Sequence, residues 1–223
     1  MNKCQYCQKD FKSERTLIAH MCVKKKRMLE KESIGSRFGL VVFQRFYELT
    51  SNNKKTKTIE DFINSKYYLA FVKFGRHIAD LRPIDSNAFV DYVINNGIGI
   101  DDWCKDSTYF AFLKIHVEQE LYDRAIERSL LEMQRWCDNN AVNISDFFRK
   151  ISTFEATQMI RSGRISPWVI YLTDSGVDLL ESLSEEQLNM IEETINVNLW
   201  KSKFLNHRED STFVKNTLKS FGL

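Results

Sequence analysis

Prolines and glycines are scarce in this chain, which has two prolines and eight glycines in 223 residues. These residues interrupt regular structure most strongly, so their scarcity favours helices over a protein of strands and turns. Apolar residues recur at helical spacing almost throughout, as in 37–49, 86–95 and 107–137, the last with a break near Asp123. The one apolar run that suits a strand, 168–172, would be alone, so a buried helix or extended segment is expected there. The sequence therefore predicts an all-α fold.

Several other features are absent. No apolar run approaches about 18 residues, which excludes a transmembrane helix, and no secretory signal pattern is seen, so we expect a cytoplasmic protein without a membrane partner. There is no glycine-rich phosphate loop, and the later histidines are scattered without a nucleophile motif (His77, His116, His207). We therefore predict no catalytic residues, no enzymatic activity and no small-molecule substrate.

The cysteines are five, an odd number that fits metal ligation better than disulfides. Cys4 and Cys7 form a two-residue-spaced knuckle that presents both thiolates to one ion. After twelve intervening residues His20 supplies a nitrogen, and Cys22 is the fourth ligand by elimination because no other Cys or His occurs before His77. This pattern predicts one tetrahedral Zn²⁺ site with three sulfurs and one nitrogen.

The spacing C-x2-C-x3-F-x5-L-x2-H from Cys4 to His20 resembles the C2H2-type zinc-finger family, here as a C2HC variant. The family places its fourth ligand after three to five intervening residues beyond the histidine, whereas only one residue separates Cys22 from His20. Positions i and i+2 of a helix point about 200° apart, so we expect the helix to end directly at His20. The resemblance implies base-facing side chains at Ser13, Thr16 and Ala19, which are too short for strong base discrimination.

Charge is distributed unevenly. Residues 1–82 carry 18 Lys+Arg and 8 Asp+Glu, a balance of +10, whereas residues 83–223 carry 14 and 22, a balance of −8. A basic first third is typical of a segment that faces a polyanion. The candidate nucleic-acid-binding residues are Lys9, Lys12, Arg15, Lys24, Lys25, Lys26, Arg27, Arg37 and Arg45.

The expected domain organisation has three parts: a zinc finger at 1–23, a basic connector at 24–36 and a multi-helix globular body at 37–223. The run 24–27 is expected to be a flexible point. If the body divides, we expect the break near 140–165. Four tryptophans are predicted core anchors (Trp103, Trp136, Trp168, Trp200).

The whole chain also resembles a group of poorly characterised proteins of T-even-like and marine tailed phages, through the finger followed by 24–27 and through 43–49, 68–75 and 164–171. The resemblance implies a phage origin and the host cytoplasm, and by analogy a role in replication, recombination or transcription. We expect a non-enzymatic accessory protein that binds nucleic acid, DNA in the first instance, with weak sequence preference. Its acidic body would dock a protein such as a helicase, polymerase or RNA polymerase. The alternative is a protein–protein adaptor or host-takeover factor in which the finger is a structural docking module.

Overall fold

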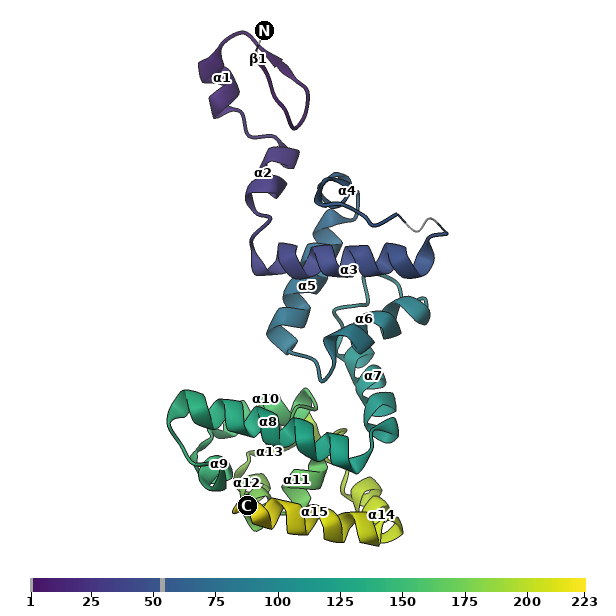
Figure 1. The fold of residues 1–223 in the computed structure, drawn as a ribbon, viewed down its shortest axis with the longest axis vertical. Helices are drawn as coiled ribbons and strands as arrows, with labels where there is room; N and C mark the ends of the chain where they lie inside the picture. The colour runs from purple at the N-terminus through teal and green to yellow at the C-terminus, as the bar shows by residue number, and fades with distance from the viewer. Residues whose placement is uncertain (1, 53–54) are drawn as a thin grey trace. The chain divides into compact units, whose positions relative to one another are not determined.

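The structure, a computed structural model, describes residues 2–52 and 55–223. Within these ranges the regular structure is helical apart from one two-stranded hairpin, which confirms the all-α prediction (Figure 1). The chain forms two compact units, Met1–Tyr109 (unit 1) and Phe110–Leu223 (unit 2). No helix in the described ranges is long and apolar enough to cross a membrane.

The N-terminal segment of unit 1 is a hairpin followed by two short helices. Its elements are β1 (Asn2–Lys3), β2 (Asp10–Phe11), α1 (Glu14–Ala19) and α2 (Val23–Leu29). The strands pair antiparallel with Asn2 opposite Phe11. Ser13 begins α1, because its hydroxyl accepts the N–H of Thr16 at 3.3 Å and satisfies one of the free amides of the first turn.

The other helices of unit 1 are α3 (Ile34–Thr50), α4 (Ile59–Asn64), α5 (Tyr68–Leu81), α6 (Ser86–Asn95) and α7 (Asp106–Gln119), which continues into unit 2. Helices α3 and α5 cross closely in Figure 1 because glycines occupy the crossing. A Cβ on Gly75 would lie 2.4 Å from the backbone nitrogen of Gly39. Aromatic side chains fill the core beside this crossing, including Phe43, Phe71, Phe74 and Trp103.

The segment 24–36, expected to be a connector with a flexible point at 24–27, contains helix α2 instead. Its Arg27 guanidinium donates to the carbonyls of Ile63 (2.6 Å) and Ser65 (3.2 Å) at the end of α4, and lies 4.4 Å from the ring centroid of Tyr68. A cation at a helix C-terminus is favourable because the last carbonyls lack helical partners. The flexible-point prediction was wrong because these partners lie 36 and more residues away in the sequence.

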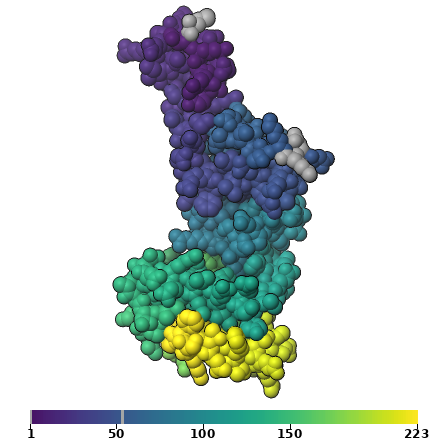
Figure 2. Space-filling model, in the orientation of Figure 1, coloured from purple at the N-terminus to yellow at the C-terminus, as the bar shows by residue number. Residues whose placement is uncertain are grey.

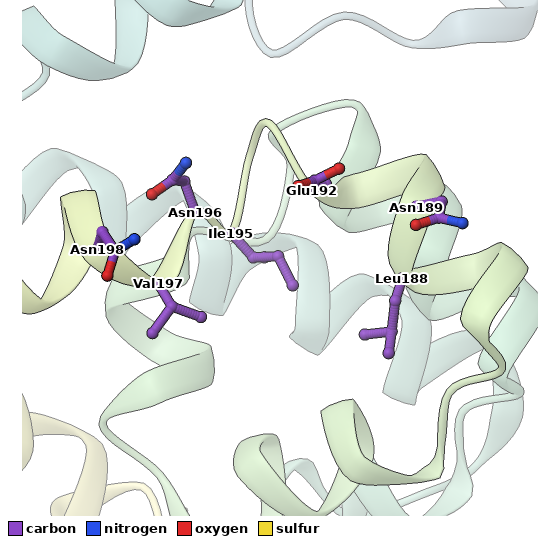
Figure 3. Close-up of a pocket in the computed structure, with 7 residues that line it drawn as sticks. All are labelled: Leu188, Asn189, Glu192, Ile195, Asn196, Val197 and Asn198. Atoms are coloured by element: carbon purple, nitrogen blue, oxygen red, sulfur yellow. The ribbon is translucent and has the colours of Figure 1, made fainter.

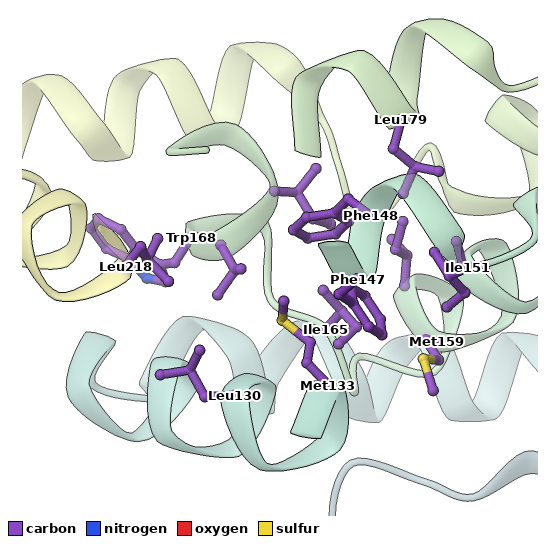
Figure 4. Packing of buried hydrophobic residues seen from close by; sticks show 14 of the residues in the cluster. Leu130, Met133, Phe147, Phe148, Ile151, Met159, Ile165, Trp168, Leu179 and Leu218 are labelled. Carbon is purple, nitrogen blue, oxygen red and sulfur yellow. The ribbon is translucent and has the colours of Figure 1, made fainter. Parts of the chain in front are cut away.

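Unit 2 is built from short helices around one hydrophobic cluster. They are α8 (Tyr122–Asn140), the 3-10 helix η1 (Ile144–Asp146), α9 (Phe147–Lys150), α10 (Thr153–Arg161), α11 (Pro167–Tyr171), α12 (Asp174–Ser182), α13 (Glu185–Ile191), α14 (Val197–Asn206) and α15 (Arg208–Ser220). Figure 4 shows Met133, Phe147 and Ile165 meeting in this cluster. Arg128 pairs with Glu120 at 2.7 Å and donates to backbone carbonyls of Gly163 and Arg164, which fixes the loop before α11.

The boundary between the units differs from the break expected near 140–165. The expected body 37–223 divides between Tyr109 and Phe110. Residues on both sides of 140–165 belong to one cluster, with Met133 before this stretch and Trp168 after it. Sharing one core is what keeps this part of the chain in a single unit.

Most expected helices are present. The break near Asp123 separates α7 from α8, and 168–172 lies mainly in helix α11, where Ser166 provides the N-cap and Pro167 the first turn. Three tryptophans are buried as predicted (Trp103, Trp168, Trp200). Trp136 is half-buried, and its Nε1 has no hydrogen-bond partner among the described residues. Helices α2 and α14 were not anticipated.

Candidate metal centre

The hairpin positions the first two cysteines. Cys4 directly follows β1, and Cys7 lies in the turn before β2. The turn is held by backbone hydrogen bonds from Cys4 N to Lys9 O (2.9 Å) and from Gln8 N to Cys4 O (2.8 Å). Gln8 adopts a left-handed conformation with φ of 61°, which reverses the chain. Both sulfurs are thereby brought to one side of the knuckle.

Helix α1 positions the histidine. It ends at Ala19, and His20 is extended with φ −71° and ψ 124°, so the helix stops where the ligand spacing requires it to stop. The His20 ring lies against Phe11 with ring centroids 4.6 Å apart. Phe11 and Leu17, the two apolar positions of the finger motif, are both partly buried. A module of this size has little other core, which is why such folds rely on a bound metal.

Cys22 has two structural roles. It is the N-cap of α2, and its Sγ accepts the N–H of Lys25 at 3.4 Å. The Lys25 ammonium in turn donates to the carbonyl of His20 at 3.0 Å. These contacts tie the fourth ligand and the start of α2 to the end of α1.

The four predicted ligand atoms converge. The Sγ atoms of Cys4, Cys7 and Cys22 and a ring nitrogen of His20 all lie within 4.8 Å of one another, and Cys7 Sγ is 3.3 Å from His20 Nε2. Three sulfurs and one imidazole nitrogen form a donor set that could hold a metal ion. Cys4 is the buried member of the group, and the backbone amide of Cys7 lowers the pKa of its thiol, which favours the thiolate form that metals bind.

The predicted base-facing positions are poorly suited to reading bases. The hydroxyls of Ser13 and Thr16 are 3.1 Å apart, and Thr16 Oγ1 also donates to the Ser13 carbonyl at 2.8 Å. Both hydroxyls therefore serve the N-terminus of α1. Ala19 has only a methyl group to offer.

The nine predicted nucleic-acid-binding residues fall into two groups. Three donate hydrogen bonds within unit 1: Lys25 to His20, Arg27 to the end of α4, and Arg45 to both carboxylate oxygens of Asp91 at 2.6 Å. The Arg45 guanidinium holds the pKa of Asp91 below its ordinary value. The other six are exposed, namely Lys9, Lys12, Arg15, Lys24, Lys26 and Arg37. Of these, Lys26 makes a long ion pair with Glu30 at 3.9 Å, and Lys9 lies 5.8 Å from the Phe11 ring centroid.

One feature of this segment was not predicted. Ile18, Met21 and Val23, which alternate with or adjoin the last two ligands, have exposed fractions of 69%, 57% and 64%. The available signal was that these apolar residues lie beside the candidate ligands in the sequence, because a segment so small cannot bury all of its apolar residues. Figure 2 shows the surface of this N-terminal segment in purple.

No family model matches this sequence, and neither the curated proteins nor the solved structures give a match.

Proposed function

We propose that the Cys4, Cys7, His20 and Cys22 group binds one Zn²⁺ ion. Zn–S bonds of about 2.3 Å and a Zn–N bond of about 2.0 Å place the ligand atoms of a tetrahedron roughly 3.5–3.8 Å apart. The 3.3 Å between Cys7 Sγ and His20 Nε2 is close to this spacing. Zinc binds sulfur and nitrogen ligands together and has no redox chemistry, so it is the metal best suited to a structural site of this composition.

We infer that the zinc-bound segment is the nucleic-acid-binding part of a non-enzymatic accessory protein. The observation that carries this proposal is the set of exposed cations in the segment that holds the candidate ligands, with Lys12 just before α1, Arg15 in its first turn, and Lys24 and Lys26 on α2. Residues 1–33 hold nine Lys+Arg and four Asp+Glu, a balance of +5. Such side chains bind phosphates regardless of the base sequence. This agrees with the engagement of the Ser13 and Thr16 hydroxyls with each other, which leaves them poorly suited to contacting bases.

The charge balance of the two units supports separate partners. Unit 1 carries 19 Lys+Arg and 13 Asp+Glu, a balance of +6, and unit 2 carries 13 and 17, a balance of −4. We propose that unit 1 engages DNA while unit 2 docks a protein of the replication, recombination or transcription machinery. The phage origin implied by the whole-chain resemblance stays a prediction.

Metal content and DNA binding test the proposal together. Purified protein should contain one zinc per chain by elemental analysis, and a fluorescent 20-base duplex and single strand should both bind at low salt. Removing the metal with a chelator should abolish binding, and adding Zn²⁺ back should restore it. Protein that lacks zinc, or zinc-loaded protein that binds neither strand at low salt, would contradict the proposal.

A second candidate function, protein docking through the finger, is favoured by the exposed side chains of Ile18, Met21 and Val23. Apolar residues exposed together mark protein contact sites more often than phosphate contacts. A variant with Ile18→Ser and Met21→Ser leaves every cation in place and separates the two readings. DNA binding unchanged by this variant supports the phosphate-binding proposal, whereas wild-type protein without DNA binding favours docking.

A further inference from the structure

Unit 2 contains a cavity of about 320 Å³ between the C-terminal half of α7 and helix α14. Leu113, Val117 and Leu199 provide apolar walls, and the side chain of Lys203 also lines it. The volume is at the lower end of the range for small-molecule sites. Its charged lining residues are two lysines, Lys203 and Lys114, and two glutamates, Glu118 and Glu193. A hollow that combines apolar walls with a few charged groups has the composition of a binding site for a small organic ion.

The Lys203 ammonium is in an unusual environment for a lysine. It lies 4.9 Å from the ring centroid of Trp200 and 6.0 Å from that of Trp168, and it donates to the carbonyl of Val117 at 3.4 Å. Burial lowers the pKa of Lys203. An ammonium has three N–H donors, so the single carbonyl leaves hydrogen-bonding capacity for a ligand.

The nearby carboxylates do not neutralise this cation. Glu118 and Glu120 act on Lys203 only through longer-range electrostatics, and Glu120 is already paired with Arg128 at 2.7 Å. No ion pair joins Lys203 to a carboxylate in the part of the chain that the structure describes. A partly desolvated cation without a bound anion gains most from a ligand that supplies one.

A neighbouring hollow of about 360 Å³ provides a contrast (Figure 3). Asn189, Asn196 and Asn198 point their amides around it, Glu192 adds a negative charge, and no Lys or Arg is among the described residues that line it. Asn196 borders both hollows. The Lys203 cavity is lined by two lysines beside its two glutamates, whereas the neighbour has a glutamate and no lysine, so an anion is expected in the Lys203 cavity and not in its neighbour.

We propose that the Lys203 cavity binds a small carboxylate with an apolar or aromatic body. The carboxylate would sit on the Lys203 ammonium, and the body would lie against Leu113, Val117 and Leu199. Glu118 and Glu193 also line the cavity, but both are exposed, as is Lys114, so water screens their charges more than it screens the half-buried Lys203 ammonium. This site lies outside the finger and is independent of the function proposed above.

Phenylacetate is a suitable probe, with phenylacetamide and phenethylamine as neutral and cationic analogues of similar size. Titration of the full-length protein by calorimetry should give a Kd on the order of 1 mM for phenylacetate, as expected for so few heavy atoms. In spectra of protein labelled at the indole nitrogens, the Trp200 signal should shift with the titration. Phenylacetamide and phenethylamine should bind at least roughly tenfold more weakly, the difference of one charge-assisted hydrogen bond.

The decisive variant is Lys203→Met, which keeps the apolar stem and removes the charge. Phenylacetate affinity should fall by roughly tenfold or more. Lys201→Met is the matched control, because Lys201 is exposed on the same helix and should have no effect. Thermal unfolding of both variants confirms that unit 2 remains folded. The proposal is overturned if phenylacetate does not bind, if Lys203→Met binds it as tightly as wild type, or if either analogue binds equally well.

Discussion

Replacing two lysines of α2 tests which cations contact DNA. All four residues of the run 24–27 appear equivalent in the sequence, but Lys25 and Arg27 have partners within unit 1 whereas Lys24 and Lys26 are exposed. The informative perturbation is therefore the double change Lys24→Gln with Lys26→Gln. Glutamine keeps helix propensity, so α2 should persist.

The expected magnitude follows from counterion release. Each neutralised phosphate contributes about −0.9 to the slope of log K against log salt, so losing two contacts should reduce the slope by about 1.8. Salt rises fourfold from about 50 to 200 mM. Over this range the factor by which DNA affinity falls should be about tenfold smaller for the double variant than for the wild type. If all four residues of the run contacted phosphates, the same double variant would remove only half of the run's contribution to the slope.

Fluorescence anisotropy of a labelled 20-base-pair duplex, titrated at four salt concentrations, measures both slopes. Arg45→Gln is the control, because the Arg45 guanidinium is bound to Asp91 and Glu48 and should not change the slope. Arg27→Gln should lower stability but leave the slope almost unchanged. An unaltered slope in the double variant, or a loss of about 0.9 in Arg27→Gln, would refute this assignment of cations.

Three further perturbations follow from the structure. Cys22→Ser should weaken zinc binding by more than about 100-fold and reduce the helicity of α2, checked by a competing chelator and by circular dichroism. Gly75→Ala should destabilise unit 1 by about 2 kcal/mol, because the added Cβ meets backbone at 2.4 Å, whereas Gly99→Ala, with nothing within 4 Å, should be neutral in urea denaturation. Arg45 lowers the pKa of Asp91 in the folded protein. The pair therefore stabilises unit 1 fully at pH values above the ordinary carboxyl pKa, and this stabilisation is lost as the pH falls through the lowered pKa of Asp91. Asp91→Asn should therefore flatten the acid side of the stability curve, measured by denaturation at several pH values.

The convergence of the four candidate ligands could be predicted from the sequence because their spacing is local. Cys4, Cys7, His20 and Cys22 lie within nineteen consecutive residues, and the spacing alone fixed where α1 had to end. The helices were predictable for the same reason, since apolar periodicity and capping residues act over one or two turns. Thr58 and Ser184, for example, each form a capping box with a residue three positions later.

What could not be predicted depends on contacts between distant segments. The partners of Arg27 are 36 and 38 residues away in the sequence, and Arg45 is 46 residues from Asp91. The local sequence pattern therefore could not distinguish these two paired cations from the exposed ones. The Lys203 cavity depends on a contact across 86 residues. The division at 109/110 was missed because no proline or glycine run marks it and α7 passes through it.

The position of Cys22 explains why the candidate metal centre leads into a helix and not into a loose linker. With one residue between the last two ligands, the final sulfur becomes the N-cap of α2, so the helix begins at the next residue. One turn later, Arg27 contacts the end of α4. A fourth ligand at the family's usual spacing would fall within 24–26 and would occupy the helical turn that presents Lys24 and Lys26. The shortened spacing thus leaves this turn free for exposed cations, and a metal bound by the proposed site would fix the start of the turn, which would link the candidate metal centre to the proposed phosphate-binding surface.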